Sequence, residues 1–392
     1  DAVDATPSAT GSGYAAADHL VRGFSPTHLS GAGCRVLGDA PVLPVPGAVP
    51  DRLGAATSRL VRSSEHASPG RYGVTLGNGV EVDLSAASRA GLLRFAYPAG
   101  ERAFVLVKTA GRVSFPSDHE VAVRALGGGF CGMDNRYVVH VLYRFDRPVR
   151  SRGTGPDGAW VGFGREAVLH AQVAISYVDL DGARRNLDRE RPGWSVALLT
   201  ARAERAWETE LRRIEVTGGD PDVRRIFRTA LYHVLVAPTP ISDADGRYPG
   251  FDGRVHRLPA GESQLSSISG WDVYRTEIPL LALLRPDVAS QVVRSLHRDA
   301  VQGGWLPRWP LVAEETGVMN GDSAAPIAAA AWAFGARDVP LDEVVAELVR
   351  QGDSVDGPRE GLADYLRLGW VPVPDVRYGA STTLEYAADD FA

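Results

Sequence analysis

The sequence predicts a multi-domain protein in which an antiparallel β-sandwich precedes an all-helical domain. In the first half, apolar and polar residues alternate with period two between turns rich in glycine and proline, whereas from about residue 185 the apolar residues take helical spacing. The chain has 392 residues, more than one hydrophobic core usually supports, so we expect two domains of comparable size. We place the sandwich at residues 1–185, a helical linker at 186–215 and the helical domain at 216–392.

The strand signals are strongest in three stretches. "YGVTLGNGVEVDL" alternates apolar residues on either side of Gly77-Asn78-Gly79, the pattern of a β-hairpin. "HAQVAISYVDLDGARR" predicts a strand that ends in a turn at Asp179 to Gly182. "RYVVHVLYRFDRPV" places apolar side chains on one face of a strand: Tyr137, Val139, Val141, Tyr143 and Phe145.

Helix signals fill the second half. Asp220 is placed to cap a helix that Pro221 begins. The last stretch, "STTLEYAADDFA", has amphipathic helical spacing but no glycine, proline or basic last turn to end it, so we expect the chain to be part of a longer polypeptide. Between these two, helices are expected near residues 271–284, 286–302, 323–335, 341–351 and 358–369.

Composition narrows the classes of function. A net charge of −6, a pI of about 5.9 and the lack of a basic run argue against nucleic acid as the partner. The apolar window "APIAAAAWAFGA" is too short to cross a bilayer, and any export signal is absent or already removed. Cys34 and Cys131 could form one disulfide or none. Zinc-site spacing is missing, whereas calcium is harder to exclude because its oxygen ligands leave no compact pattern.

Tryptophan, acidic residues and glycine recur together in four segments of the helical half. These segments are "PISDADGRYPGFDG", "GWDVYRT", "QGGWLPRWPL" and "AEETGVMNGDSA". They are expected to be loops that precede helices, and loops held by a rigid helical scaffold are where sites usually lie. Carboxylates combined with tryptophans favour glycoside chemistry, in which one acid protonates the leaving oxygen and a second carboxylate activates water.

The segment "GWDVYRT" is the strongest candidate. Trp271 and Tyr274 lie three residues apart, as do Asp272 and Arg275, so each pair shares one side of a helix. An indole face stacks on the C–H groups of a sugar ring, while a carboxylate and a guanidinium grip neighbouring hydroxyls. The same arrangement suits a buried salt bridge equally well.

The other candidate residues each have a simpler structural interpretation. Trp305 and Trp309 are either core residues or a platform for sugar, and Glu314 and Glu315 could serve only as partners of a helix dipole. His28 alone is best interpreted as a hydrogen-bonded structural histidine. Two aspartates of "SDADG", Asp243 and Asp245, are compatible with an Asx turn or with half of a calcium-binding loop. The Asx turn is favoured, because no glutamate stands at the closing position of such a loop.

Taken in order, these segments resemble glycoside hydrolase family 92, the calcium-dependent inverting α-mannosidases. The matching stretches are "GFSPTHLSGAGCRVLGD", "FRTALYHVLVAPTPISDADGRYPGFDG", "SGWDVYRTEIPLLALLRP", "QGGWLPRWPL", "EETGVMNGD", "YLRLGWVPV" and "TTLEYAADDFA". The resemblance implies a β-sandwich followed by an (α/α)6 barrel, with residues 216–392 forming its first half. The mannose pocket would then lie where the two domains meet.

The resemblance also implies roles for individual residues. Trp271 and Asp272 would bind the terminal mannose, and a sandwich loop that carries His28, Gly31 and Cys34 would close over it. We extend the expected substrate-binding set from the composition of the four segments to Arg275, Trp305, Trp309 and Glu315.

Three departures from the family pattern limit what can be carried over. A further sandwich stretch with a "PFG"-type motif, usual before the first matching segment, is not found in this chain. The family's general acid and base, with most of its calcium ligands, are expected beyond Ala392. Ser323 occupies a position where many members have a histidine, which puts substrate preference in doubt but not the fold.

The expected function is therefore a secreted, exo-acting α-mannosidase that releases terminal mannose from glycans of N-glycan or mannan type, with inversion and with Ca²⁺ as cofactor. Two alternatives stay open: a glycosidase of the same family that removes mannose-1-phospho-6-mannose caps, and a non-catalytic mannose-binding protein. A third is a sandwich-plus-barrel glycosidase for another sugar. The expected partners are a mannose-containing glycan and the remainder of the polypeptide, or a second chain, completing the barrel.

Overall fold

The computed structural model describes residues 2–4, 17–29, 34–373 and 376–392, and the chain divides into two compact units. The first, here called the sheet unit, comprises residues 1–130, 136–228 and 243–245. The second, the helical unit, comprises residues 131–135, 229–242 and 246–392. The expected order of an antiparallel β domain followed by a helical domain is confirmed.

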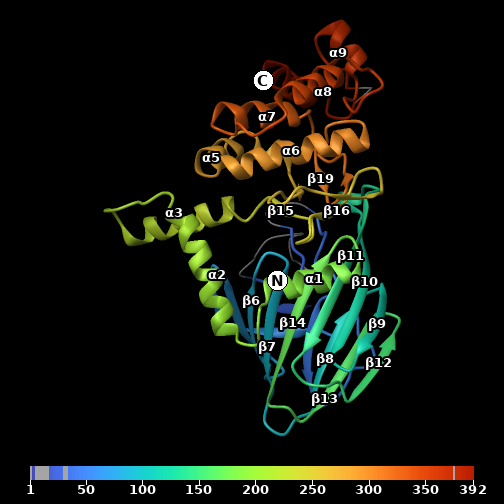
Figure 1. Cartoon of the computed structure of the whole chain (residues 1–392), viewed down its shortest axis with the longest axis vertical. Coiled ribbons are helices and arrows are strands. Elements are labelled where there is room, and N and C mark those ends of the chain that lie inside the picture. The colour runs from blue at the N-terminus through green and yellow to red at the C-terminus, as the bar shows by residue number, and fades with distance from the viewer. Residues whose placement is uncertain (1, 5–16, 30–33, 374–375) are drawn as a thin grey trace. The chain divides into compact units, whose positions relative to one another are not determined.

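The sheet unit is built on one large antiparallel sheet (Figure 1). Its strand order is β12-β13-β8-β3-β2-β4-β5-β6-β7-β14-β11-β10-β9, with β1 paired to β2. The strands are β1 (Ala2–Asp4), β2 (Leu20–Phe24), β3 (Val42–Pro46), β4 (Ser58–Ser68), β5 (Arg71–Leu76), β6 (Glu81–Ala86), β7 (Ala90–Ala96), β8 (Ala103–Lys108), β9 (Arg112–Ser117), β10 (Glu120–Gly128), β11 (Arg136–Phe145), β12 (Ser151–Gly155), β13 (Gly158–Gly164) and β14 (Val168–Ser176).

The predicted hairpin forms as β5 and β6, which pair antiparallel. Its turn is held by Asn78, whose side-chain oxygen accepts a hydrogen bond from the Val80 N–H at 3.1 Å, while Gly79 has a φ of 84° that a side chain would disfavour. The predicted apolar face of β11 is also confirmed, since all five of its side chains are at most 5% exposed. Local pattern therefore determined both features.

Two helices pack on the sheet, α1 (Leu180–Glu190) and α2 (Val196–Leu211). The expected turn at Asp179 is instead the start of α1, because the Asp179 carboxylate accepts the Gly182 N–H at 2.5 Å as an N-cap. Ala183 and Leu187 of α1 join a buried apolar cluster with residues of β7, β10, β11 and β14. Residues 186–215, placed in a linker from the sequence, thus contribute to the packing of the sheet unit.

Helix α3 (Pro221–Val234) begins where the sequence predicts, with Asp220 accepting the Asp222 N–H at 2.7 Å. The helical unit continues with α4 (Gly270–Val273), α5 (Glu277–Leu284), α6 (Pro286–Gly303), α7 (Ala324–Ala333), α8 (Leu341–Asp353), α9 (Leu362–Leu368) and α10 (Gly379–Phe391). Short two-stranded pairs join these helices: β15 (Thr239–Pro240) with β18 (Leu265–Ser266), β16 (Arg247–Pro249) with β17 (Val255–Arg257), and β19 (Pro310–Leu311) with β20 (Glu314–Glu315).

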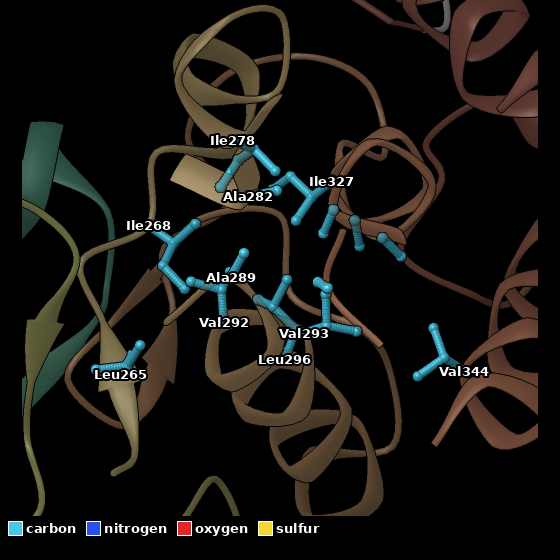
Figure 2. Packing of buried hydrophobic residues seen from close by; sticks show 14 of the residues in the cluster. Leu265, Ile268, Ile278, Ala282, Ala289, Val292, Val293, Leu296, Ile327 and Val344 are labelled. Carbon is cyan, nitrogen blue, oxygen red and sulfur yellow. The ribbon is translucent and has the colours of Figure 1, made fainter. Parts of the chain in front are cut away.

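The core of the helical unit forms around α6. Val292, Val293 and Leu296 of α6 are at most 3% exposed and belong to one buried cluster with Ile278 of α5 and Ile327 of α7 (Figure 2). The cluster also includes Leu306, from the segment "QGGWLPRWPL". Among the helices that the structure describes, none has the length and apolarity needed to cross a bilayer.

The helix expected at residues 271–284 is divided into α4 and α5. Pro279 is the cause, because a proline inside a helix removes one backbone hydrogen bond and its ring clashes with the carbonyl four residues earlier. The chain therefore breaks at Thr276, whose φ and ψ are −138° and −38°, and a new helix begins at Glu277 with the proline in its first turn. The break leaves Tyr274 and Arg275 in a short connection between the two helices.

Candidate functional site

A cleft in the helical unit gathers three of the four predicted segments. Its volume is about 540 Å³, counting its solvent-open mouth. Phe251 comes from the first segment, Trp305 and Arg308 from the third, and Glu315 and Asp322 from the fourth. Gln351, Pro358 and Arg359 complete the wall opposite, and these residues lie outside every segment that the sequence indicated.

The second segment, "GWDVYRT", lies directly against residues of this cleft. Gly270 is packed so tightly that a Cβ atom there would lie 2.6 Å from the Arg308 carbonyl oxygen and 2.8 Å from the Cβ of Ser323. Ser323 follows Asp322, which lines the cleft. All four predicted segments therefore meet in one region of the helical unit.

Within "GWDVYRT", Trp271 is half-buried and Asp272 is exposed. The Asp272 carboxylate accepts a hydrogen bond from the Ser269 hydroxyl through one oxygen, Oδ2. Arg275 lies over the rings of both Trp271 and Tyr274, with its guanidinium carbon 4.6 Å and 4.3 Å from the ring centres. An indole with one face covered by a cation and a carboxylate beside it offers a stacking surface and a hydroxyl acceptor together.

Glu277, at the start of α5, adds a second carboxyl group near Asp272. Burial, and then the negative charge of Asp272, raise the pKa of Glu277 to about 7. This shift favours the protonated, neutral form of Glu277, whereas an ordinary glutamate is ionised at neutral pH. Carboxyl groups whose pKa is raised by burial and a neighbouring charge are typical of functional sites.

The two tryptophans of "QGGWLPRWPL" differ. Trp305 is half-buried and lines the cleft, with the Arg350 guanidinium carbon 4.0 Å from the centre of its ring. Trp309 is only 3% exposed, so it belongs to the core. Of the two interpretations that the sequence left open, the structure supports a surface position for Trp305 and a core position for Trp309.

Glu315 holds the loop of the third and fourth segments together. Its carboxylate accepts the backbone N–H groups of Arg308, Trp309 and Gly317, the last at 2.6 Å. Arg308 in turn donates to the carbonyl oxygens of Met319 and Pro358. The polar side chains at this side of the cleft are therefore engaged in shaping its wall.

At the base of the cleft lies a buried ion pair. Asp322 and Arg359 are 3% and 5% exposed, and the Arg359 Nε donates to Asp322 Oδ2 at 2.9 Å. Gln351 donates to the other oxygen of Asp322 at 2.7 Å, and Arg359 also donates to Asp390 at 2.6 Å. Both charges are thus compensated and hydrogen-bonded, which is the condition for burying an ion pair without a large loss of stability.

The two aspartates of "SDADG", Asp243 and Asp245, form hydrogen bonds and an ion pair within the sheet unit. Asp243 is 3% exposed, accepts hydrogen bonds from Ser176 and Asn186 at 2.8 Å each, and anchors its loop within the sheet unit. Burial raises the pKa of Asp243 to about 6. Asp245 pairs with Arg185 at 3.1 Å. Both aspartates are thus engaged with side chains of the sheet unit.

The loop candidates of the sheet unit are described only in part. His28 is exposed, and Gly31 lies outside the described residues. Cys34 is half-buried, and both cysteines of the chain are disulfide-bonded. Of the two states that the sequence left open, the disulfide is the one found, so Cys34 contributes no free thiol.

The described residues contain no cluster of three or more histidine, cysteine, aspartate or glutamate side chains that could hold a metal ion. Two buried carboxylate oxygens in the helical unit, Asp299 Oδ2 and Asp389 Oδ1, have no hydrogen-bond partner, but each is a single ligand. The carboxylates of the described residues therefore do not gather into a cluster that could hold calcium.

Comparison with known proteins establishes the family. The model of the glycosyl hydrolase family 92 N-terminal domain matches residues 2–179, and that of the family 92 catalytic domain matches residues 182–392. The chain therefore belongs to glycoside hydrolase family 92. The boundary between the two matches lies at the start of α1.

Solved structures agree with this assignment. A family GH92 α-mannosidase from Bacteroides thetaiotaomicron superimposes with a TM-score of 0.88 at 25% identity over 97% of this chain and 56% of its own; it is also known in complex with mannoimidazole. A GH92 inverting mannosidase from the same species gives a TM-score of 0.84 at 25% identity, over 97% of this chain and 55% of its own.

A curated relative from Arthroderma benhamiae, described as an uncharacterized secreted glycosidase, is 23% identical over 57% of this chain and 27% of its own length. The chain thus spans about half the length of the structural relatives and about a quarter of the length of the Arthroderma benhamiae protein.

Proposed function

We propose that the protein is an exo-acting α-mannosidase that releases terminal mannose from α-mannosides of N-glycan or mannan type, with inversion of configuration. The observation that carries this proposal is that the segment with Trp271 and Asp272, although neither residue lines the cleft, packs through Gly270 against Arg308 and Ser323, in a chain of glycoside hydrolase family 92. Solved relatives described as α-mannosidases, one of them an inverting mannosidase, support the choice of sugar and outcome.

In this proposal the residues of "GWDVYRT" bind and orient the sugar. One face of the Trp271 ring is covered by Arg275, so the opposite face is the one on which the C–H groups of mannose would stack. Asp272 would accept hydrogen bonds from neighbouring hydroxyls, with Ser269 holding one of its oxygens in place. Trp305 and Phe251, which line the cleft, would then contact the part of the glycan beyond the terminal residue.

Inversion requires an acid that protonates the leaving oxygen and a base that activates water on the opposite face of the sugar. Neither role is assigned to a residue of this chain. We also propose that the enzyme needs Ca²⁺, which when bound would polarise the sugar and its attacking water. Among the described residues, no cluster of histidine, cysteine, aspartate or glutamate side chains is present that could hold the ion.

We propose an extracellular location. Both cysteines are disulfide-bonded, which is typical of secreted proteins, and the relative from Arthroderma benhamiae is described as secreted. Export would also bring the enzyme to its glycan substrates.

The test is hydrolysis by the purified full-length protein, with α-1,2-mannobiose and a mannose-phosphate-capped glycan as alternative substrates. Mannose release from the mannobiose that is lost with a chelator and restored by calcium is the expected result. Release from the capped glycan alone would replace the proposal by the uncapping reaction. Binding of mannose without release from either substrate would instead make the protein a mannose-binding protein, and release that survives chelation would remove calcium from the proposal.

A further inference from the structure

Helix α10 carries the motif "LEYAADD", whose polar side chains each bind a different segment of the helical unit. Asp389 accepts the Asp322 N–H at 2.6 Å, and Asp390 binds Arg359 and the Tyr365 hydroxyl. Glu385 is directed to "GWDVYRT", the segment proposed to bind the sugar. One helix therefore contacts three segments around the candidate site.

Glu385 uses both of its oxygens. Oε2 accepts the Tyr274 hydroxyl at 2.9 Å, and Oε1 accepts the Arg275 Nη2 at 2.6 Å. The Glu385 side chain is 12% exposed and that of Arg275 is 41% exposed, so the contact lies where burial meets solvent. A short bond between a guanidinium and a half-buried carboxylate is charge-assisted and stronger than a neutral hydrogen bond.

This contact determines where the Arg275 guanidinium lies. The arginine side chain is long and flexible, and its place over the Trp271 and Tyr274 rings depends on groups that hold its far end. Apart from the rings, the guanidinium contacts Glu385 and the carbonyl oxygen of Trp271. Arg275, which the sequence suggested as a ligand for sugar hydroxyls, is thus already engaged in supporting the indole.

We propose that Glu385 is a positioning residue for the carbohydrate site, because it holds Arg275 against one face of Trp271 and so fixes the indole that receives the sugar ring on its other face. The inference rests on the proposed function for its ligand, but the contact network itself does not. Glu385 touches no substrate in this account and acts through Arg275.

The first experiment is a double-mutant cycle of binding in the full-length protein, with methyl α-mannoside as the probe. Glu385→Gln keeps an oxygen for Tyr274 but removes the ion pair, and Arg275→Met keeps a stem of similar length without the guanidinium. Each single change is expected to weaken binding roughly fivefold or more, the lower end of ordinary coupling between sites. The double variant should bind no more weakly than Arg275→Met, because Glu385 acts through that residue.

A matched control is Asp222→Asn, which breaks the exposed Arg225–Asp222 pair on α3 within the sheet unit. It should leave the affinity unchanged. The proposal would be overturned if the affinity losses of the two single variants multiplied in the double variant. Normal binding by Glu385→Gln would overturn it as well.

A second readout needs no sugar. Acrylamide quenching of Trp271 fluorescence, obtained as the difference between each protein and the same protein with Trp271→Phe, should increase in Glu385→Gln, because the indole loses its cover. Unchanged quenching would contradict the positioning role. If the wild-type protein does not bind the mannoside but the quenching changes as expected, the proposed function fails and the contact network stands.

Discussion

At the scale of single residues, Asp299 and Gln264 form an unusual buried pair. Asp299 is 2% exposed and Gln264 is 1% exposed, and the Gln264 Nε2 donates to Asp299 Oδ1 at 2.9 Å and to the Ser295 carbonyl at 3.2 Å. The other two atoms, Asp299 Oδ2 and Gln264 Oε1, are buried acceptors without a donor. Burial raises the pKa of Asp299 well above its usual range. A single proton on Oδ2, donated toward Oε1, would satisfy both atoms.

We therefore predict that Asp299→Asn changes the pH dependence of stability. In the wild type the folded state keeps a proton that the unfolded state releases above about pH 4, so the free energy of unfolding falls by up to about 1.4 kcal/mol per pH unit as the pH rises from there toward the folded pKa. Asparagine has no proton to lose. Urea unfolding between pH 5 and 8 should show that the free energy of unfolding of Asp299→Asn rises relative to that of the wild type as the pH rises. The same pH dependence of this free energy in both proteins would contradict a neutral Asp299.

Asp272 gives a second residue-scale prediction. It is exposed and makes one side-chain contact, with Ser269, so Asp272→Ala should leave the melting temperature nearly unchanged. Loss of a charged acceptor for sugar hydroxyls should weaken binding of methyl α-mannoside by roughly 30-fold. Isothermal titration calorimetry measures the affinity. Because Asp272→Asn keeps a hydrogen-bond acceptor, its affinity should lie between those of the wild type and Asp272→Ala. Normal binding by the alanine variant would remove Asp272 from the site.

At the scale of elements, helix α10 binds several separate segments of the helical unit. Its acidic residues bind the connection after α4, the N-terminus of α7 and the residue that pairs with Asp322. Burial raises the pKa of one of them, Asp389, to about 7. An amphipathic helix was predicted here, but not these partners, because they lie far away in sequence: Tyr274 and Glu385 are 111 residues apart.

Arg359 tests the role of this network in stability. Arg359→Met would leave Asp322 buried with only Gln351 as a partner and Asp390 without its charge pair, so we expect a loss of about 3–5 kcal/mol. The matched control is Arg367→Met on α9, whose pair with Asp364 is exposed and is worth about 1 kcal/mol or less. Urea unfolding followed by far-ultraviolet circular dichroism compares the two. Equal losses would show that the buried pair has no special role.

At the scale of the whole molecule, sequence patterns predicted the order of domains and the approximate limits of α6, α7 and α8. Features set by nearest neighbours were predictable, such as the turn at Asn78 and the cap at Asp220. Trp305 and Trp309 show where this ends: they lie in one motif, yet only tertiary packing decides that the first lines the cleft and the second joins the core. Arg359 and Gln351 had no local signal, because their importance comes from Asp322, which lies many residues away.

Proton nuclear magnetic resonance of the sugar released by the full-length protein, with calcium present, tests most directly whether the protein hydrolyses α-mannosides with inversion. We predict that β-mannose appears first and then equilibrates with the α anomer, because water attacks the face opposite the leaving group. Release of α-mannose first, or no release of mannose at all from an α-mannoside that the protein binds, would contradict it.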